Sequence, residues 1–162
     1  MVTISHEKTI EVETKVAAFK LKYDERYPIE RATRLSVGID VRSRIDCELL
    51  PGQRLAIPTG VFWDVSWIDK DWNIELQIRP RSGLVRQKGV IGVFGTVDAD
   101  FTGEIHAILI NNGMTRCDFK AGDKVGQMVI GASPNSADLA EITADRIRGD
   151  GGFGSTDRGE HE

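Results

Sequence analysis

The chain has 162 residues, of which 40% are hydrophobic and 28% charged, and it contains 17 glycines against 5 prolines. This length and apolar content suit one folded domain and exclude a wholly disordered chain, while the excess of glycine favours a turn-rich β protein over a helical bundle. The formal net charge of −4 supplies no diffuse basic field, so we expect no direct nucleic-acid binding. Polyphosphate would require a local basic site.

Short alternating segments dominate the chain, and turn residues separate most of them. We predict an edge strand or ordered arm over residues 1–14, and a β domain that extends to residue 147. Its strands are expected at 16–22, 39–45, 53–57, 60–65, 73–79, 90–97, 103–110 and 124–130. Short helices are expected at 82–88 and 137–146, and turns at 51–52, 58–60, 111–113 and 121–123. The pattern predicts an all-β, jelly-roll-like sandwich or barrel, followed by a flexible glycine-rich arm at 148–162.

The N-terminal segment and the two cysteines bear on the cellular compartment of the protein. Residues 1–15 are charged throughout and lack the apolar core of a signal peptide, and no run approaches the roughly 18 apolar residues of a membrane span. Cys47 and Cys117 lie far apart without a CxxC pair or a histidine cluster, which favours reduced structural thiols over a zinc site or a disulfide. These features predict a soluble, cytoplasmic protein with no membrane partner.

The first segment whose residues could bind a ligand is Arg79–Leu84, where a strand ends and a helical turn begins. Unpaired N–H groups at a helix start, the Arg81 guanidinium, the Ser82 hydroxyl and the close approach allowed by Gly83 would together suit phosphate oxygens. The alternative interpretation is that Ser82 only caps the helix.

The second segment is Gly95–Glu104, in which Asp98 and Asp100 lie two residues apart in an extended stretch. Paired carboxylates can hold a divalent ion, or one can act as a general base toward water. The alternative is a hairpin turn in which an aspartate caps its own backbone.

The third segment is Arg148–Asp157, in which Phe153 lies among glycines and before two hydroxyl residues. Glycines let a chain wrap a ligand, hydroxyls and amides can donate to phosphate, and an aromatic ring can stack on a nucleobase. A frayed terminus is the alternative.

Together with residues 36–43 (SVGIDVRS) and 122–130 (GDKVGQMVI), these three segments resemble the five ordered motifs of the trimeric dUTPase family. The resemblance runs from about residue 28 to residue 157, and five motifs in order are far more specific than any one of them. It implies the family's activity, hydrolysis of dUTP to dUMP and pyrophosphate with Mg²⁺ on the triphosphate. This activity limits uracil in DNA and supplies dUMP for thymidylate synthesis. It also implies a homotrimer with sites at subunit interfaces, each closed by a C-terminal arm.

Site residues follow from the same resemblance. Asp98 matches the carboxylate that orients and deprotonates the water attacking the α-phosphate, and Asp40 matches an aspartate near the metal, acting through water or by orienting its neighbours. Mg²⁺ is then held mainly by substrate phosphates. A backbone hairpin at about 90–101 would select uracil, and Phe153 would lie over the base. The implied substrate-binding residues are Arg81, Ser82, Gly83, Gly95, Thr96, Val97, Phe101, His106, Gln127, Arg148, Phe153, Gly154, Ser155 and Thr156.

The chain departs from the family pattern at several positions. Phe101 stands where a tyrosine is common against the deoxyribose, and Gly92 stands where many bacterial members have asparagine. Residues 62–72 form an expected loop with three tryptophans, Trp63, Trp67 and Trp72, which either cap the sandwich or form an exposed patch for a protein partner. Two alternatives to the diphosphatase therefore stay open: a related dCTP deaminase or mixed dCTP/dUTP enzyme, and a phage-type regulatory protein that binds a repressor.

Overall fold

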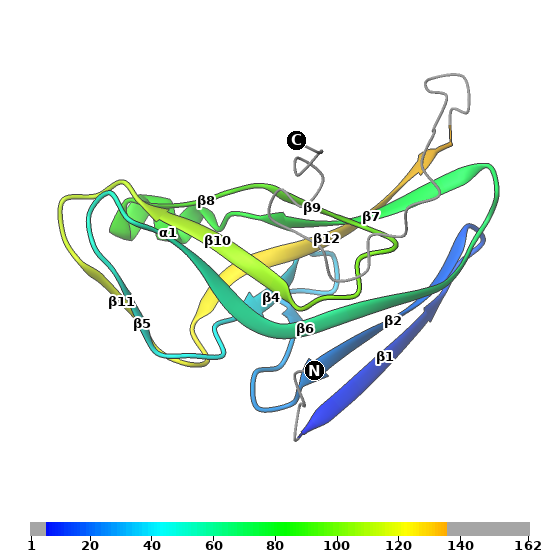
Figure 1. Cartoon of the computed structure of the whole chain (residues 1–162), viewed down its shortest axis with the longest axis horizontal. Helices are drawn as coiled ribbons and strands as arrows, with labels where there is room; N and C mark the ends of the chain where they lie inside the picture. The colour runs from blue at the N-terminus through cyan, green and yellow to red at the C-terminus, as the bar shows by residue number, and fades with distance from the viewer. Residues whose placement is uncertain (1–5, 136–162) are drawn as a thin grey trace, which may run out of the picture.

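The computed structural model describes residues 6–135, which form two five-stranded sheets, a two-stranded ribbon and one short helix (Figure 1). The predictions for 137–146 and for the arm at 148–162 lie outside these residues. The elements are β1 (Glu7–Glu13), β2 (Ala17–Asp24), β3 (Glu30–Arg31), β4 (Ile39–Arg42), β5 (Cys47–Leu49), β6 (Arg54–Ile68), β7 (Trp72–Arg79), α1 (Ser82–Lys88), β8 (Val90–Gly92), β9 (Gly95–Asp98), β10 (Ile105–Asn111), β11 (Cys117–Phe119) and β12 (Lys124–Pro134).

The two sheets pack their apolar faces together, which confirms the predicted all-β sandwich. The first sheet has the order β1-β2-β6-β10-β8 and the second β3-β4-β12-β7-β9, with every pair antiparallel. Side chains alternate along β7 and β10 between buried and half-buried, as the period of two requires. The strand predicted at 103–110 is present as β10, with one buried and one half-buried face. In the described range no helix has the length and hydrophobicity of a membrane span.

Strand β6 runs through the segment Pro58–Gly60 that was predicted to be a turn, so the expected break between 53–57 and 60–65 is wrong. The segment is a β-bulge, at which the register against β10 shifts between Ile105 and His106. Gly60 has a φ of +72°, and its N–H donates to Glu104 Oε1 at 2.7 Å. The bulge lets β6 pair first with β10 and then with β2, and one strand thereby joins two parts of the sheet.

Residues 90–97 form two strands in different sheets rather than the one strand expected. β8 pairs with β10 in the first sheet and β9 pairs with β7 in the second, so the expected hairpin of 90–101 is not made by pairing β8 with β9. Gly92 permits this crossing, because a Cβ there would lie 2.9 Å from Pro80 Cα. A side chain at this position would therefore collide with Pro80 in this structure.

Within the predicted N-terminal segment, β1 (Glu7–Glu13) pairs along its whole length with β2 at the edge of the first sheet. Sequence patterns did not reveal the short β5–β11 ribbon, which lies with α1 at the end of the molecule opposite to the β6–β7 connection (Figure 1). Cys47 and Cys117 belong to this ribbon, and both are free thiols as predicted. Burial raises the pKa of the Cys47 thiol, which disfavours its reactive thiolate form.

The three tryptophans do not form one surface patch. Residues 62–68 continue β6, and Trp63 is only 2% exposed, with its ring edge-on to Phe19 at a centroid distance of 6.2 Å. Trp67 is 46% exposed, and it lies beyond a register shift between β2 and β6, where Phe19 is opposite Val65 but Ala18 is opposite Trp67. The expected loop at 62–72 is thus mostly strand, and Trp63 belongs to the core.

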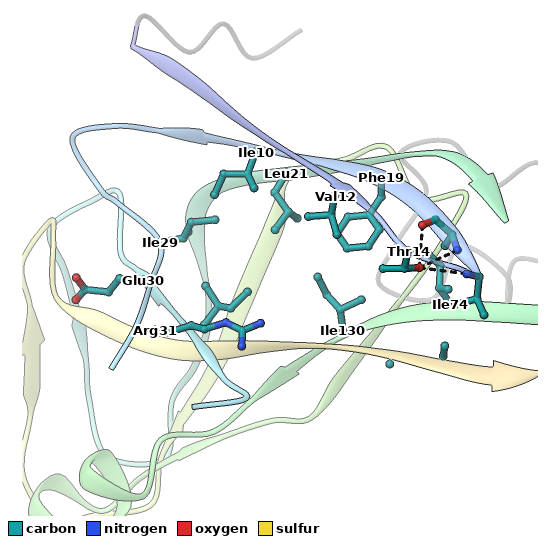
Figure 2. A pocket seen from close by; sticks show the side chains of 15 residues that line it. Ile10, Val12, Thr14, Phe19, Leu21, Ile29, Glu30, Arg31, Ile74 and Ile130 are labelled. Atoms are coloured by element: carbon teal, nitrogen blue, oxygen red, sulfur yellow. Dashed lines mark hydrogen bonds between the residues drawn. The ribbon is translucent and has the colours of Figure 1, made fainter. Parts of the chain in front are cut away.

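A cavity of about 510 Å³ lies between the β1–β2 hairpin and the inner face of the second sheet. Figure 2 shows Ile10, Val12 and Phe19 on one side of it, and Ile74 and Ile130 on the other. The lining is mainly aliphatic, and none of the predicted site residues contributes to it. Glu30, which pairs with Lys124, is among its lining residues, so the cavity borders this ion pair.

Candidate functional site on the outer face of the second sheet

The outer face of the second sheet carries a row of polar side chains. Asp40 on β4 lies opposite Gln127 on β12, which in turn lies opposite Arg79 on β7. Directly opposite residues in antiparallel strands share a face. The chain neighbours of these three residues point into the core: Ile39, Met128 and Ile78.

The predicted general base lies on the same face but farther along the sheet. On β9, Asp98 is opposite Glu75 and Thr96 is opposite Gln77. Arg79 lies four residues beyond Glu75 along β7, about 13 Å at roughly 3.3 Å per residue. Within one chain Asp98 therefore does not meet the row that contains Gln127.

Arg81 is held at two of its three guanidinium nitrogens. Its Nε lies 3.4 Å from Asp40 Oδ1, and its Nη1 donates to the main-chain oxygen of Lys124 at 3.2 Å. Asp40 is only 8% exposed, so its negative charge needs a nearby counter-ion. The arrangement presents a half-buried guanidinium beside the start of α1.

The second counter-ion of Asp40 is Lys124, which sequence reasoning did not single out. Lys124 Nζ lies 2.8 Å from both Asp40 Oδ2 and Glu30 Oε1, and Glu30 also accepts from Arg42 Nη2 at 2.6 Å. The two carboxylates raise the pKa of Lys124, and Lys124 in turn lowers the pKa of Glu30. Lys124 did lie inside the quoted segment 122–130, but its partner Glu30 is 94 residues earlier, and sequence separation hides such a pair.

Gln127 is placed over a glycine. A Cβ at Gly38 would collide with Gln127 Oε1, so the amide keeps this orientation only beside a glycine. Gln127 Nε2 donates to the main-chain oxygen of Pro80 at 3.1 Å. The amide thus holds the turn directly before Arg81, and its second N–H can donate another hydrogen bond.

The helix start differs from one expectation. The N-cap of α1 is Arg81 in extended conformation, without a side-chain cap bond, and Ser82 is the first helical residue. The interpretation of Ser82 as a capping residue is therefore wrong. Ser82 is exposed, and a Cβ at Gly83 would meet nothing within 4 Å, so the turn is open to a ligand.

The remaining predicted residues are spread over both sheets. Val97 packs against the core, so its side chain faces away from the polar row. The ring of Phe101 lies over Gly103, where a Cβ would come within 2.6 Å of the ring. His106 is on β10, with Nδ1 2.9 Å from the main-chain oxygen of Glu104. Gly95 begins β9. The predictions for Arg148, Phe153, Gly154, Ser155 and Thr156 lie outside the described residues.

Asp40 does not fit a direct metal ligand in this arrangement. Both of its oxygens face cations, Lys124 at one and Arg81 at the other. Residues 6–135 contain no group of three or more histidine, cysteine or acidic side chains that could hold a metal ion.

Fold and site together define an all-β sandwich in which Arg81, Lys124 and Gln127 gather beside the start of α1. The family model for dUTPase matches residues 25–157, which is most of the chain. The chain belongs to the dUTPase family.

Curated relatives support this membership. The chain is 38% identical over 126 residues to the deoxyuridine 5'-triphosphate nucleotidohydrolase of Anaeromyxobacter sp. (strain Fw109-5), covering 76% of this chain and 82% of the relative. It is also 38% identical over 132 residues to the enzyme of that name from Rhizobium rhizogenes, covering 76% and 81%.

Solved structures agree on the fold. The dUTPase of Streptococcus mutans has a TM-score of 0.59 at 23% identity, covering 78% of this chain and 94% of its own. A G164S variant of the Staphylococcus bacteriophage 80alpha dUTPase with dUpNHpp has a TM-score of 0.62 at 18% identity, covering 85% and 97%.

Proposed function

We propose that this chain hydrolyses dUTP to dUMP and pyrophosphate. The observation that carries the proposal is the match to the dUTPase family over residues 25–157, joined by relatives that are named for this activity. The same comparisons favour the diphosphatase over a dCTP deaminase.

Asp98 is the proposed general base. It orients a water and takes its proton while the water oxygen bonds to the α-phosphorus, and the bond between the α-phosphorus and the bridging oxygen breaks to release pyrophosphate. Such a displacement depends on a positioned nucleophile and on charge neutralisation. Arg81 and the open turn at Ser82 and Gly83 are proposed to bind phosphate oxygens, and Gln127 to contribute an amide donor. Mg²⁺, bound to the triphosphate, neutralises part of its charge.

The proposed homotrimer is supported by the separation of Asp98 from the Arg81 end of the sheet. About 13 Å of β7 lies between the position opposite Asp98 and Arg79. A water deprotonated by Asp98 must reach a phosphate held by Arg81, so the two residues of one site are proposed to come from different chains.

Complementation tests this proposal directly. Asp98→Asn should lose about a hundredfold or more in turnover. Arg81→Gln should lose about a hundredfold in kcat/KM for dUTP, because its guanidinium binds phosphate oxygens. Chains of the two variants, unfolded together and refolded as mixed oligomers, should regain activity, because some sites then combine Asp98 from one chain with Arg81 from another. Asp100→Asn, two residues from Asp98, is the matched control and should keep most activity.

Two results would contradict these assignments. Near wild-type turnover of Asp98→Asn would remove Asp98 from the role of base. Mixed oligomers as inactive as their parents, with a wild-type mixture recovering fully under the same protocol, would place both residues in one chain's site.

The substrate is tested by pyrophosphate release from dUTP, dCTP, dTTP and UTP, each with Mg²⁺ and with EDTA. Release from dUTP alone, abolished by EDTA, supports the proposal. Release of ammonia from dCTP would favour the deaminase, and no reaction with any nucleotide would favour a regulatory protein.

A further inference from the structure

Arg81 has to satisfy two anions, the Asp40 carboxylate of the protein and the phosphate of the ligand. A guanidinium beside a carboxylate prefers a short bidentate pair. Here the contact to Asp40 is long, 3.4 Å from Nε, and Nη1 is turned to the Lys124 main-chain oxygen instead. Another interaction of Asp40 therefore prevents a bidentate ion pair with Arg81.

Lys124 supplies the competing charge. Its Nζ lies 2.8 Å from Asp40 Oδ2, shorter than the contact between Asp40 and Arg81. Because Asp40 is nearly buried, its charge is compensated mainly by these close cations. With the ammonium at one carboxylate oxygen, the guanidinium is not needed as the sole counter-ion.

Glu30 and Arg42 form the outer end of the same network. Glu30 Oε1 accepts from Lys124 Nζ at 2.8 Å and from Arg42 Nη2 at 2.6 Å. The Lys124 side chain is thus drawn toward Glu30 as well as toward Asp40. Glu30 is more exposed than Asp40, so solvent screens its share of the attraction.

We propose that Lys124 is a positioning residue for Arg81: by compensating Asp40, it keeps the guanidinium oriented for phosphate rather than paired to the protein. The inference rests on the proposed function, since it takes the ligand of Arg81 to be the triphosphate. Without the Lys124 ammonium, Arg81 forms a full ion pair with Asp40, and its binding of the substrate phosphate weakens.

Steady-state kinetics of the full-length chain test the inference. Lys124→Gln should raise KM for dUTP about tenfold while kcat changes much less, because the lost interaction serves binding in both ground and transition states. Lys124→Arg should restore KM, since a guanidinium can also bridge Asp40 and Glu30. Lys120→Gln is the matched control, because Lys120 makes a similar 2.9 Å ion pair with Asp46 on the exposed surface.

Glu30→Gln should act in the opposite sense. The Lys124 charge is then devoted to Asp40, so KM for dUTP should be no higher than in wild type. This variant changes an exposed side chain, and it keeps the inference testable if Lys124→Gln does not fold. A raised KM in Glu30→Gln would contradict the proposed competition.

The double variant separates action through Arg81 from direct phosphate binding. In an Arg81→Gln background, Lys124→Gln should change KM by less than about twofold, because contacting residues that act through one another are not additive. An equal effect in both backgrounds would mean that Lys124 binds phosphate itself. Unchanged KM in Lys124→Gln, with active wild type, overturns the inference alone, whereas inactive wild type overturns the proposed function and the inference with it.

Discussion

The buried amide of Asn111 offers a sharp test of how the end of the sheet is held. Asn111 is the last residue of β10 and is fully buried. Its Nδ2 donates to the main-chain oxygens of Leu49 at 2.7 Å and Thr115 at 2.8 Å, and its Oδ1 accepts from the N–H of Gly113 at 2.9 Å. One side chain thus joins β10, β5 and the turn before β11.

Asn111→Ala removes all three bonds at once. At a net value of about 0.5–1.5 kcal/mol each, the free energy of unfolding should fall by roughly 3 kcal/mol. With an m-value of about 2 kcal/mol per M, the urea midpoint should fall by about 1.5 M. Asn112→Ala is the control, because Asn112 is exposed and should shift stability by no more than about 0.5 kcal/mol.

Equilibrium urea unfolding, followed by circular dichroism, measures the difference. Both variants and the wild type must be compared at one protomer concentration, because dissociation of the proposed homotrimer would couple to unfolding. A loss below about 1 kcal/mol for Asn111→Ala, or a loss equal to that of Asn112→Ala, would refute the view that this amide holds the ribbon to the sheet.

Two further predictions concern the site and acid stability. Gly38→Ala should lower kcat/KM for dUTP about tenfold by displacing Gln127, whereas Gly126→Ala, whose Cβ has contacts no closer than 3.5 Å, should match wild type; equal kinetics would remove the packing argument. Arg26 lowers the pKa of Asp24, so this pair stabilises the fold above about pH 4 and loses its effect as pH falls through the lowered value. Asp24→Asn should therefore lower stability at pH 7 and flatten the acid decline in a pH-dependent melt; a melt that overlays the wild type would contradict this.

Local sequence pattern was a good guide to elements whose pairing is regular. The alternation in 73–79 predicted β7, and the polar N-terminal segment predicted an edge strand. The residues following Pro80 predicted a short helix, which the structure has at Ser82–Lys88. These predictions succeed because burial on one face imposes a period that neighbouring residues reveal by themselves.

Pattern failed where a distant partner decides the conformation. Pro58 and Gly60 are turn residues in most contexts. Here Glu104 accepts the Gly60 N–H, and β10 pairs with β6 on both sides of the bulge, so the strand stays continuous. The β8 and β9 segments look like one strand, but each is claimed by a different sheet. Such outcomes depend on which strand pairs with the segment, and the local residues do not identify that partner.

The sequence by itself determined the family and the all-β class, because five short motifs and an alternating pattern are local properties. Only the tertiary structure decided that one outer face carries Asp40, Thr96, Asp98 and Gln127. It also decided that about 13 Å of β7 separates Glu75, the residue opposite Asp98, from Arg79. It also decided the pairing of Lys124 with Glu30 and Asp40. Charges far apart in the chain acquire partners only when strand register brings them together, and that register is set by packing across the whole sheet.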